Sequence, residues 1–145
     1  MNPDKHPPVD GRQVHMSGKY LILCLGLIAL MLLSGCNGKK AMEVNEAQNG
    51  GSIELQSGDT LMIKLDGNPT TGYQWEMLPN ADGVVELQGE PAYKSTSNLI
   101  GSGGVYKFTL KAVKAGSTRV DLKYYRSFEA DVPPIQTFSV DVVVK

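Results

Sequence analysis

The stretch VYKFTLKAV, Val105–Val113, alternates between two kinds of side chain along its length. Alternation with a period of two is typical of a β-strand that packs one face on a core and turns the other to water. The core face is expected to consist of Tyr106, Phe108, Leu110 and Ala112. The sequence therefore predicts a long, half-buried strand here.

The same period recurs near the end of the chain. There the apolar positions are Phe138, Val140, Val142 and Val144. Other strands are predicted at Ser52–Gln56, Thr60–Leu65, Tyr73–Leu78, Val84–Gln88, Ala92–Ser95, Thr118–Tyr125 and Ile135–Val144. Turn residues separate many of them, at Ser57–Asp59, Asn80–Gly83, Gly89–Pro91 and Lys114–Ser117. Short strands at this spacing predict an all-β fold, an immunoglobulin-like sandwich or barrel of about 7–8 strands, over residues 52–145.

The lone tryptophan, Trp75, lies in one of these strands and has two interpretations. A large indole on an alternating strand usually packs between sheets, whereas an exposed one would be a binding hot spot. We expect the core position, with Tyr73 and Met77 on the same face and Gln74 and Glu76 turned to solvent.

The beginning of the chain has a different character. Tyr20–Leu33 is a continuous apolar run of 14 residues, whereas a helix that crosses a bilayer needs roughly 20. With Lys19 before it, the run is typical of a secretory signal. LSGC, Leu33–Cys36, then resembles a bacterial lipobox, in which Cys36 receives diacylglycerol. The alternative is a membrane-anchor helix with an incidental cysteine.

These features predict the domain order. Residues 1–15 are an upstream extension or a misplaced start, because Met16 begins a more typical signal, and residues 16–35 are a lipoprotein signal peptide. Residues 36–51 comprise the lipidated Cys36 and a flexible tether, which is polar and rich in glycine. Asn37 is not the Asp that marks inner-membrane retention in such proteins. We therefore expect a lipid anchor in a bacterial outer membrane facing the periplasm, with the cell surface as the alternative.

Processing at Cys36 limits the chemistry that is available. Both histidines, His6 and His15, precede the signal, Cys24 lies within it, and Cys36 would carry lipid. A Cys–His nucleophile, a Ser–His triad, a histidine metal site and a disulfide are therefore excluded. We expect no enzyme, no metal and no other cofactor.

Charge excludes a further class of partner. From residue 37 on, 11 Lys and Arg stand against 13 Asp and Glu, a net charge of −2, and no basic stripe occurs. Nucleic acid is therefore not an expected partner, and we expect a monomer. A catalytic pair of carboxylates stays formally possible. The carboxylates in or near the loops are Asp66, Glu90, Glu129 and Asp131, and their spacing singles out no pair.

Three connections are long for hairpin loops, namely Asp66–Gly72, Thr96–Gly104 and Arg126–Pro134. If strands that follow one another in the chain are antiparallel neighbours, every second connection falls at the same end of the sandwich. We expect the three long connections to meet there. The short turns at Ser57–Asp59 and Lys114–Ser117 belong to the other end. This asymmetry indicates one functional end, the alternative being three unrelated long loops.

The long connections contain NPTTGY at Asn68–Tyr73, then GSGG at Gly101–Gly104, then Arg126 and Phe128. This order resembles the chagasin-type inhibitors of papain-family cysteine proteases, over residues 53–144. NPTTG is the most specific element. The third element departs from the family's order of Arg, Pro and an aromatic residue, because Ser127 takes the place of the proline.

The resemblance implies a tight, reversible inhibitor that pushes its first long loop into the active-site cleft of the protease and clamps either side with the other two. The protease-binding residues that it implies are Asn68, Pro69, Thr70, Thr71, Gly72, Gly101, Ser102, Gly103, Gly104, Arg126 and Phe128. Pro69 would stiffen the first loop, and the hydroxyls of Thr70 and Thr71 would hydrogen-bond near the catalytic Cys–His pair.

Alternatives stay open for the third loop and for the function. Arg126 is either a donor fork for the protease or a solvated charge at a strand end, and Phe128 is either an apolar contact or a cap on the sandwich. The alternative function is an envelope lipoprotein that binds another protein or an envelope component through the same loops without inhibiting a protease.

Overall fold

The computed structural model describes residues 38–145, and the predicted signal peptide and Cys36 lie outside the described residues. Residues 38–145 form one compact unit with its own hydrophobic core, which is the property of a domain that folds by itself. Its strands are β1 (Ala41–Val44), β2 (Gly51–Leu55), β3 (Thr60–Gly67), β4 (Gln74–Met77), β5 (Val85–Leu87), β6 (Ala92–Ser95), β7 (Gly104–Ala112), β8 (Gly116–Tyr125) and β9 (Gln136–Val144). Two short 3₁₀ turns are η1 (Glu46–Gln48) and η2 (Pro69–Thr71).

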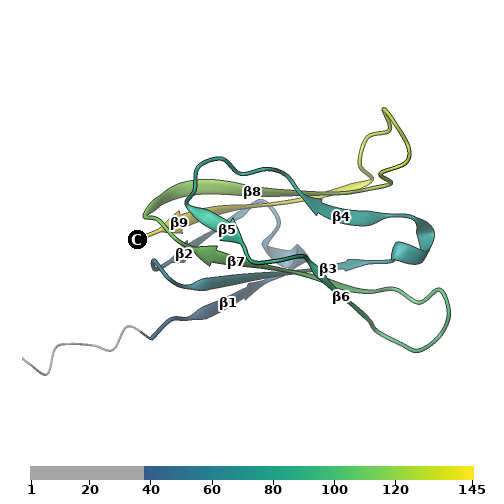
Figure 1. Cartoon of the computed structure of the whole chain (residues 1–145), viewed down its shortest axis with the longest axis horizontal. Helices are drawn as coiled ribbons and strands as arrows, with labels where there is room; N and C mark the ends of the chain where they lie inside the picture. Colours follow the sequence, from purple (N-terminus) through teal and green to yellow (C-terminus); the bar gives the residue numbers. More distant parts are fainter. Residues whose placement is uncertain (1–37) are drawn as a thin grey trace, which may run out of the picture. The chain divides into compact units, whose positions relative to one another are not determined.

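Two sheets pack face to face, which confirms the predicted all-β sandwich (Figure 1). One sheet has the order β1-β3-β7-β5, with β6 also paired to β7, and the other has the order β2-β9-β8-β4. β1 pairs with β3, and β2 with β9, in parallel, whereas the other neighbours are antiparallel. The nine strands exceed the predicted 7–8 because β1 was not expected.

The core lies where the alternation places it. The predicted core face of β7 is buried in full, and so is that of β9. Trp75 is 6 % exposed, so the core position is confirmed, and Tyr73 and Met77 pack beside it at the margin of the core. No described residue belongs to a helix that is long and apolar enough to span a membrane.

The predicted flexible tether is wrong for most of its length. Ala41–Val44 forms β1 on the edge of a sheet, Val44 is buried, and η1 follows directly. Asp59, itself buried, accepts hydrogen bonds from the backbone N–H groups of Lys40 (2.8 Å) and Gln56 (2.9 Å) and so fastens the start of β1 to the β2–β3 turn. The domain therefore begins about ten residues before the predicted Ser52, because a four-residue strand is too short for its alternation to stand out in the sequence.

The assumption that chain neighbours are antiparallel partners is also wrong. β3 and β4 belong to different sheets. β5 and β6 pair with successive parts of β7, both antiparallel to it, so the chain does not reverse direction at Gly89–Pro91. Strict reversal at every connection would have sent the β3–β4 loop to the opposite end. The unreversed passage from β5 to β6 is what brings the three long connections to one end.

Candidate functional site

Three connections lie together at the end of the sandwich where β3, β6 and β8 finish (Figure 1). We call them loop 1 (residues 68–73), loop 2 (residues 96–103) and loop 3 (residues 126–135). Gly104 is the register partner of both Gly67 and Ser95, which sets loops 1 and 2 side by side. Hydrogen bonds then join the loops, so the predicted common end is observed, and the loops are fixed to one another.

Loop 1 begins as a capped 3₁₀ turn. The Asn68 side chain accepts a hydrogen bond from the Thr70 N–H (3.1 Å), and Pro69 occupies the first position of η2. The Asn68 N–H donates to the Tyr124 hydroxyl of β8 (2.7 Å), and its side-chain amide donates to the Gly101 carbonyl of loop 2 (2.8 Å). Asn68 therefore ties loop 1 to the sheet below and to loop 2.

The threonine hydroxyls of loop 1 point back into the loop. Thr70 Oγ1 donates to Asn68 Oδ1, and Thr71 Oγ1 donates to the Asn68 carbonyl, each at 2.6 Å. Both residues and Pro69 are exposed. In the free protein these bonds stiffen the loop, and because each hydroxyl donates only once, its oxygen can still accept a hydrogen bond from a catalytic pair.

Gly72 ends the turn at a position that needs glycine for two reasons. Its φ of +83° lies in the left-handed region, and its N–H donates to the Pro69 carbonyl (3.0 Å). A Cβ at this position would also lie 3.0 Å from two ring atoms of Phe128. The ring of Phe128 therefore rests on loop 1, although 71 % of the residue stays exposed.

Arg126 lies at the start of loop 3 and turns inward. Its Nε–H donates to the Thr71 carbonyl (3.2 Å), and its guanidinium carbon lies 4.4 Å from the centre of the Tyr73 ring. One terminal nitrogen pairs with Glu129 at 2.7 Å, and this hydrogen bond is the main reason why the pKa of Arg126 is raised above its ordinary value. Arg126 therefore joins loops 1 and 3 and is not simply a solvated charge at a strand end, and its role as a donor fork for the protease stays a prediction.

Loop 2 is closed by its own polar side chains. The Ser95 hydroxyl lies 3.0 Å from that of Ser102 and donates to the Ser97 carbonyl (2.6 Å), and Thr96 bonds the Gly103 carbonyl. Gly101, Ser102 and Gly103 belong to loop 2 and therefore lie at the predicted common end of the sandwich. Gly101 is exposed, and Ser102 and Gly103 are half-buried.

Gly104 differs from its neighbours in loop 2. It is the first residue of β7 and is buried, and a Cβ there would meet the Lys94 carbonyl oxygen at 2.3 Å. Its role is close packing between β6 and β7. The expectation that Gly104 is one of the protease-binding residues is therefore corrected, because Gly104 is buried within the sheet.

Sequence reasoning missed the apolar tip of loop 2. Leu99 is 78 % exposed, and Ile100 is fully exposed. Two large aliphatic side chains that are exposed to water at the tip of an internally hydrogen-bonded loop indicate a surface that contacts another protein. Their sequence signal was the pair of aliphatic residues inside an otherwise small and polar loop.

The arrangement at this end of the sandwich can bind a partner. Among residues 38–145, no group of His, Cys, Asp or Glu is placed to hold a metal ion. A rigid sandwich end with an exposed, uncharged turn and apolar tips on two loops is the surface of a protein-binding domain.

A match to a known protein family identifies which kind of protein-binding domain this is. Residues 54–142 match the model of the chagasin family of peptidase inhibitors, I42, so the chain belongs to this family of cysteine protease inhibitors and is not an enzyme. The match runs from the end of β2 into β9 and includes all three loops.

Two related proteins and two solved structures are similar to this chain over most of the domain. The chain is 28 % identical to amoebiasin-1 of Entamoeba histolytica, and the alignment covers 72 % of this chain and 100 % of that protein. It is 29 % identical to chagasin of Trypanosoma cruzi, and that alignment covers 68 % of this chain and 93 % of that protein. The solution structure of amebosin superposes with a TM-score of 0.60 at 27 % identity, covering 72 % of this chain and 98 % of that one. The crystal structure of the cysteine protease inhibitor EhICP2 from Entamoeba histolytica shares the fold, with a TM-score of 0.66 at 23 % identity and coverages of 74 % and 98 %.

Proposed function

We propose that this protein inhibits papain-type cysteine proteases by inserting loop 1 into the active-site cleft while loops 2 and 3 contact the walls on either side. The observation that carries the proposal is the pair of bonds between loops, from Asn68 to Gly101 (2.8 Å) and from Arg126 to Thr71 (3.2 Å). They make three separate connections into one preformed surface. A surface that is ordered before binding loses less conformational entropy in the complex.

The composition of loop 1 suits a narrow cleft. Pro69, Thr70 and Thr71 are exposed and uncharged, so docking desolvates no ionised group on this loop. The backbone turn is closed by Asn68 and Gly72, which leaves the exposed residues on a fixed frame. Leu99 and Ile100 on one side and Phe128 on the other supply apolar area for the flanking contacts.

Titration of papain with the domain of residues 38–145 tests this function. We expect activity to fall linearly to zero near one molar equivalent, and the domain to stay uncleaved and to be recovered intact after the complex is dissociated. Undiminished papain activity at a large excess of the domain would contradict the proposal and favour an envelope protein that uses the same loops for another partner. Slow cleavage within loop 1 would show a substrate and not an inhibitor.

We also propose that the domain is anchored to a bacterial membrane through lipid on Cys36, on the periplasmic side of the outer membrane. The apolar run that ends in LSGC at Leu33–Cys36 supports the anchor, and Asn37 supports the choice of membrane. An anchored inhibitor would guard the envelope against proteases that enter the periplasm. Fractionation experiments on Cys36, given in the Discussion, test this proposal separately from inhibition.

A further inference from the structure

Loop 3 has no proline ring to stiffen its backbone at Ser127 and Phe128. Ser127 and Phe128 are both exposed, and neither backbone is restrained by a ring. Yet Phe128 rests against Gly72 of loop 1 in a defined place. Some non-covalent restraint must therefore hold the first turn of loop 3, and the contacts of Arg126 and Glu129 on either side of Phe128 identify it.

Glu129 closes that turn twice. Its backbone N–H donates to the Arg126 carbonyl (3.2 Å), and its carboxylate receives a hydrogen bond from the Arg126 guanidinium (2.7 Å). The side chains of both residues are about one-third exposed, so the pair is partly shielded from water. The two bonds span Ser127 and Phe128 and fix the direction in which Phe128 leaves the turn.

The other contacts of the guanidinium extend this restraint to loop 1. Arg126 donates to the Thr71 carbonyl, and its guanidinium lies over the Tyr73 ring and within 6.0 Å of the Phe128 ring centre. Glu129 therefore orients a cation that touches loop 1 at two residues and approaches the Phe128 ring. Without this carboxylate, only the Thr71 carbonyl and the Tyr73 ring would hold the guanidinium in place.

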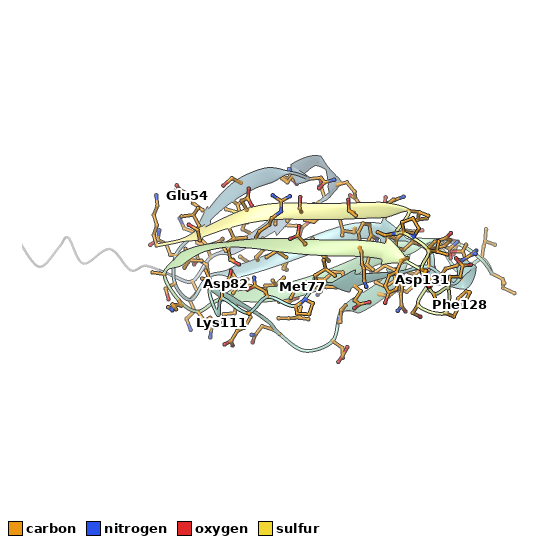
Figure 2. All side chains as sticks on the ribbon, turned by 90° about the horizontal axis from the view of Figure 1, so that it is seen from above. Glu54, Met77, Asp82, Lys111, Phe128 and Asp131 are labelled. Atoms are coloured by element: carbon orange, nitrogen blue, oxygen red, sulfur yellow. The ribbon has the colours of Figure 1, made fainter. Side chains whose placement is uncertain are left out.

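We propose that Glu129 is a positioning residue of the inhibitory surface: through Arg126 it locks loop 3 onto loop 1 and holds Phe128 in its binding orientation. This inference rests on the proposed function and adds to it that an ion pair, and not only the turn of loop 1, preorganises the surface. Figure 2 shows Phe128 at the loop end, far from Glu54 at the other end of the domain.

The first test concerns the free domain and needs no protease. In NMR spectra of residues 38–145, we expect a slowly exchanging Arg126 Nε–H signal and a nuclear Overhauser effect between the Phe128 ring and Gly72. Both should weaken in Glu129→Gln, which keeps the size of the side chain and removes its charge. Glu54→Gln is the matched control, because it removes an ion pair of the same 2.7 Å separation, with Lys145, away from the loops. Unchanged loop signals in Glu129→Gln would overturn the inference whether or not the domain inhibits a protease.

The second test is a double-mutant cycle on papain inhibition. A partly exposed ion pair contributes up to about 1 kcal/mol, so we expect Glu129→Gln to weaken inhibition up to about fivefold. In the Phe128→Ala background the same change should weaken inhibition less than about twofold, because its effect passes through Phe128. Arg126→Lys should resemble Glu129→Gln, since an ammonium cannot make the same planar set of contacts. Glu54→Gln should have no effect.

Two results of the cycle would overturn the inference. Equal losses from Glu129→Gln with and without Phe128 would mean that Glu129 contacts the protease itself. An unaltered inhibition constant for Glu129→Gln would mean that the lock does not matter for binding. Failure of the wild-type domain to inhibit papain would instead contradict the proposed function, while the NMR test would still decide whether the lock exists.

Discussion

Trp75 makes two contacts that connect the core to loop 1. Its Nε1–H donates to the Asp66 carbonyl (2.8 Å), and its ring stacks on Tyr124 with a centroid separation of 5.1 Å. Tyr124 in turn accepts a hydrogen bond from the N–H of Asn68, the residue that caps loop 1. The buried indole therefore supports the base of the loop as well as the space between the sheets.

Removing the indole should destabilise the fold strongly. We expect Trp75→Ala to lower the free energy of unfolding by roughly 3–5 kcal/mol, because it leaves a large cavity and an unpaired Asp66 carbonyl. Urea denaturation followed by circular dichroism measures this. In the wild-type domain, Trp75 fluorescence should be blue-shifted and protected from iodide. Red, easily quenched emission would contradict the buried position.

Thr71 allows a change that separates binding from folding. Thr71→Arg puts a long charged side chain on an exposed turn, so the thermal midpoint should stay within a few degrees of wild type. Surface changes usually alter stability by no more than about 0.5 kcal/mol. Inhibition of papain should weaken at least about tenfold, or 1.4 kcal/mol, because the cleft would have to admit and desolvate the charge.

Thr71→Ser is the control for this prediction, since it keeps the hydroxyl that bonds the Asn68 carbonyl. It should inhibit nearly as well as wild type. Phe128→Ala, measured alongside, should weaken inhibition less than Thr71→Arg. Full inhibition by Thr71→Arg, or a loss that appears only together with unfolding, would make loop 1 an ordinary structural turn.

At the scale of the elements, the carboxylate of Asp59 fastens the start of β1, in addition to the pairing of β1 with β3. The backbone N–H groups of Lys40 and Gln56 hold the pKa of Asp59 below its ordinary value of 3.8. A carboxyl group with a lowered pKa in the folded state stabilises the fold above its unfolded pKa, and the stabilisation is lost as the pH falls below that value. Detachment of β1 is therefore expected to begin in acid below about pH 4.

Asp59→Asn tests this attachment. We expect a lower thermal midpoint at pH 7 and faster hydrogen exchange in Ala41–Val44, because a neutral amide accepts these N–H groups less well. The difference from wild type should shrink as the pH falls below 3.8. A constant difference at all pH values would show that the ionised state of Asp59 does not matter.

Loop 2 presents its two aliphatic residues on a frame that does not depend on them. The bonds that close the loop are made by Ser95, Thr96 and Ser102, so a substitution at Leu99 or Ile100 should leave its shape intact. We expect the double change Leu99→Ser and Ile100→Ser to weaken papain inhibition by about tenfold, with an unchanged thermal midpoint. Unaltered inhibition would show that the tip stays in water in the complex.

At the scale of the whole molecule, the proposed lipid anchor can be tested separately from inhibition. Two or more acyl chains, at about 0.8 kcal/mol per buried CH₂, would hold the protein stably on a membrane. We expect Cys36→Ser to remove the lipid and to yield an unlipidated precursor, while the domain of residues 38–145 keeps its inhibitory activity. Wild-type protein that fractionates as wholly soluble, without lipid mass on Cys36, would contradict the anchor.

Much of this protein could be predicted from local sequence. The core faces of β7 and β9 and the burial of Trp75 were predicted, because side-chain alternation acts between residues a few positions apart. Family membership followed from the order of the loop motifs. None of these depends on knowing which strands pair.

Only the tertiary structure decided the features that depend on distant partners. β1 forms because β3 and Asp59, about twenty residues away, supply its hydrogen bonds. The three loops meet because β5 and β6 share one edge of β7 without a reversal. Arg126 turns inward because Thr71, 55 residues earlier, offers a carbonyl beside the Tyr73 ring. Strand pairing and charge placement of this kind are set by contacts across the folded chain, and such contacts leave no periodic pattern in the sequence.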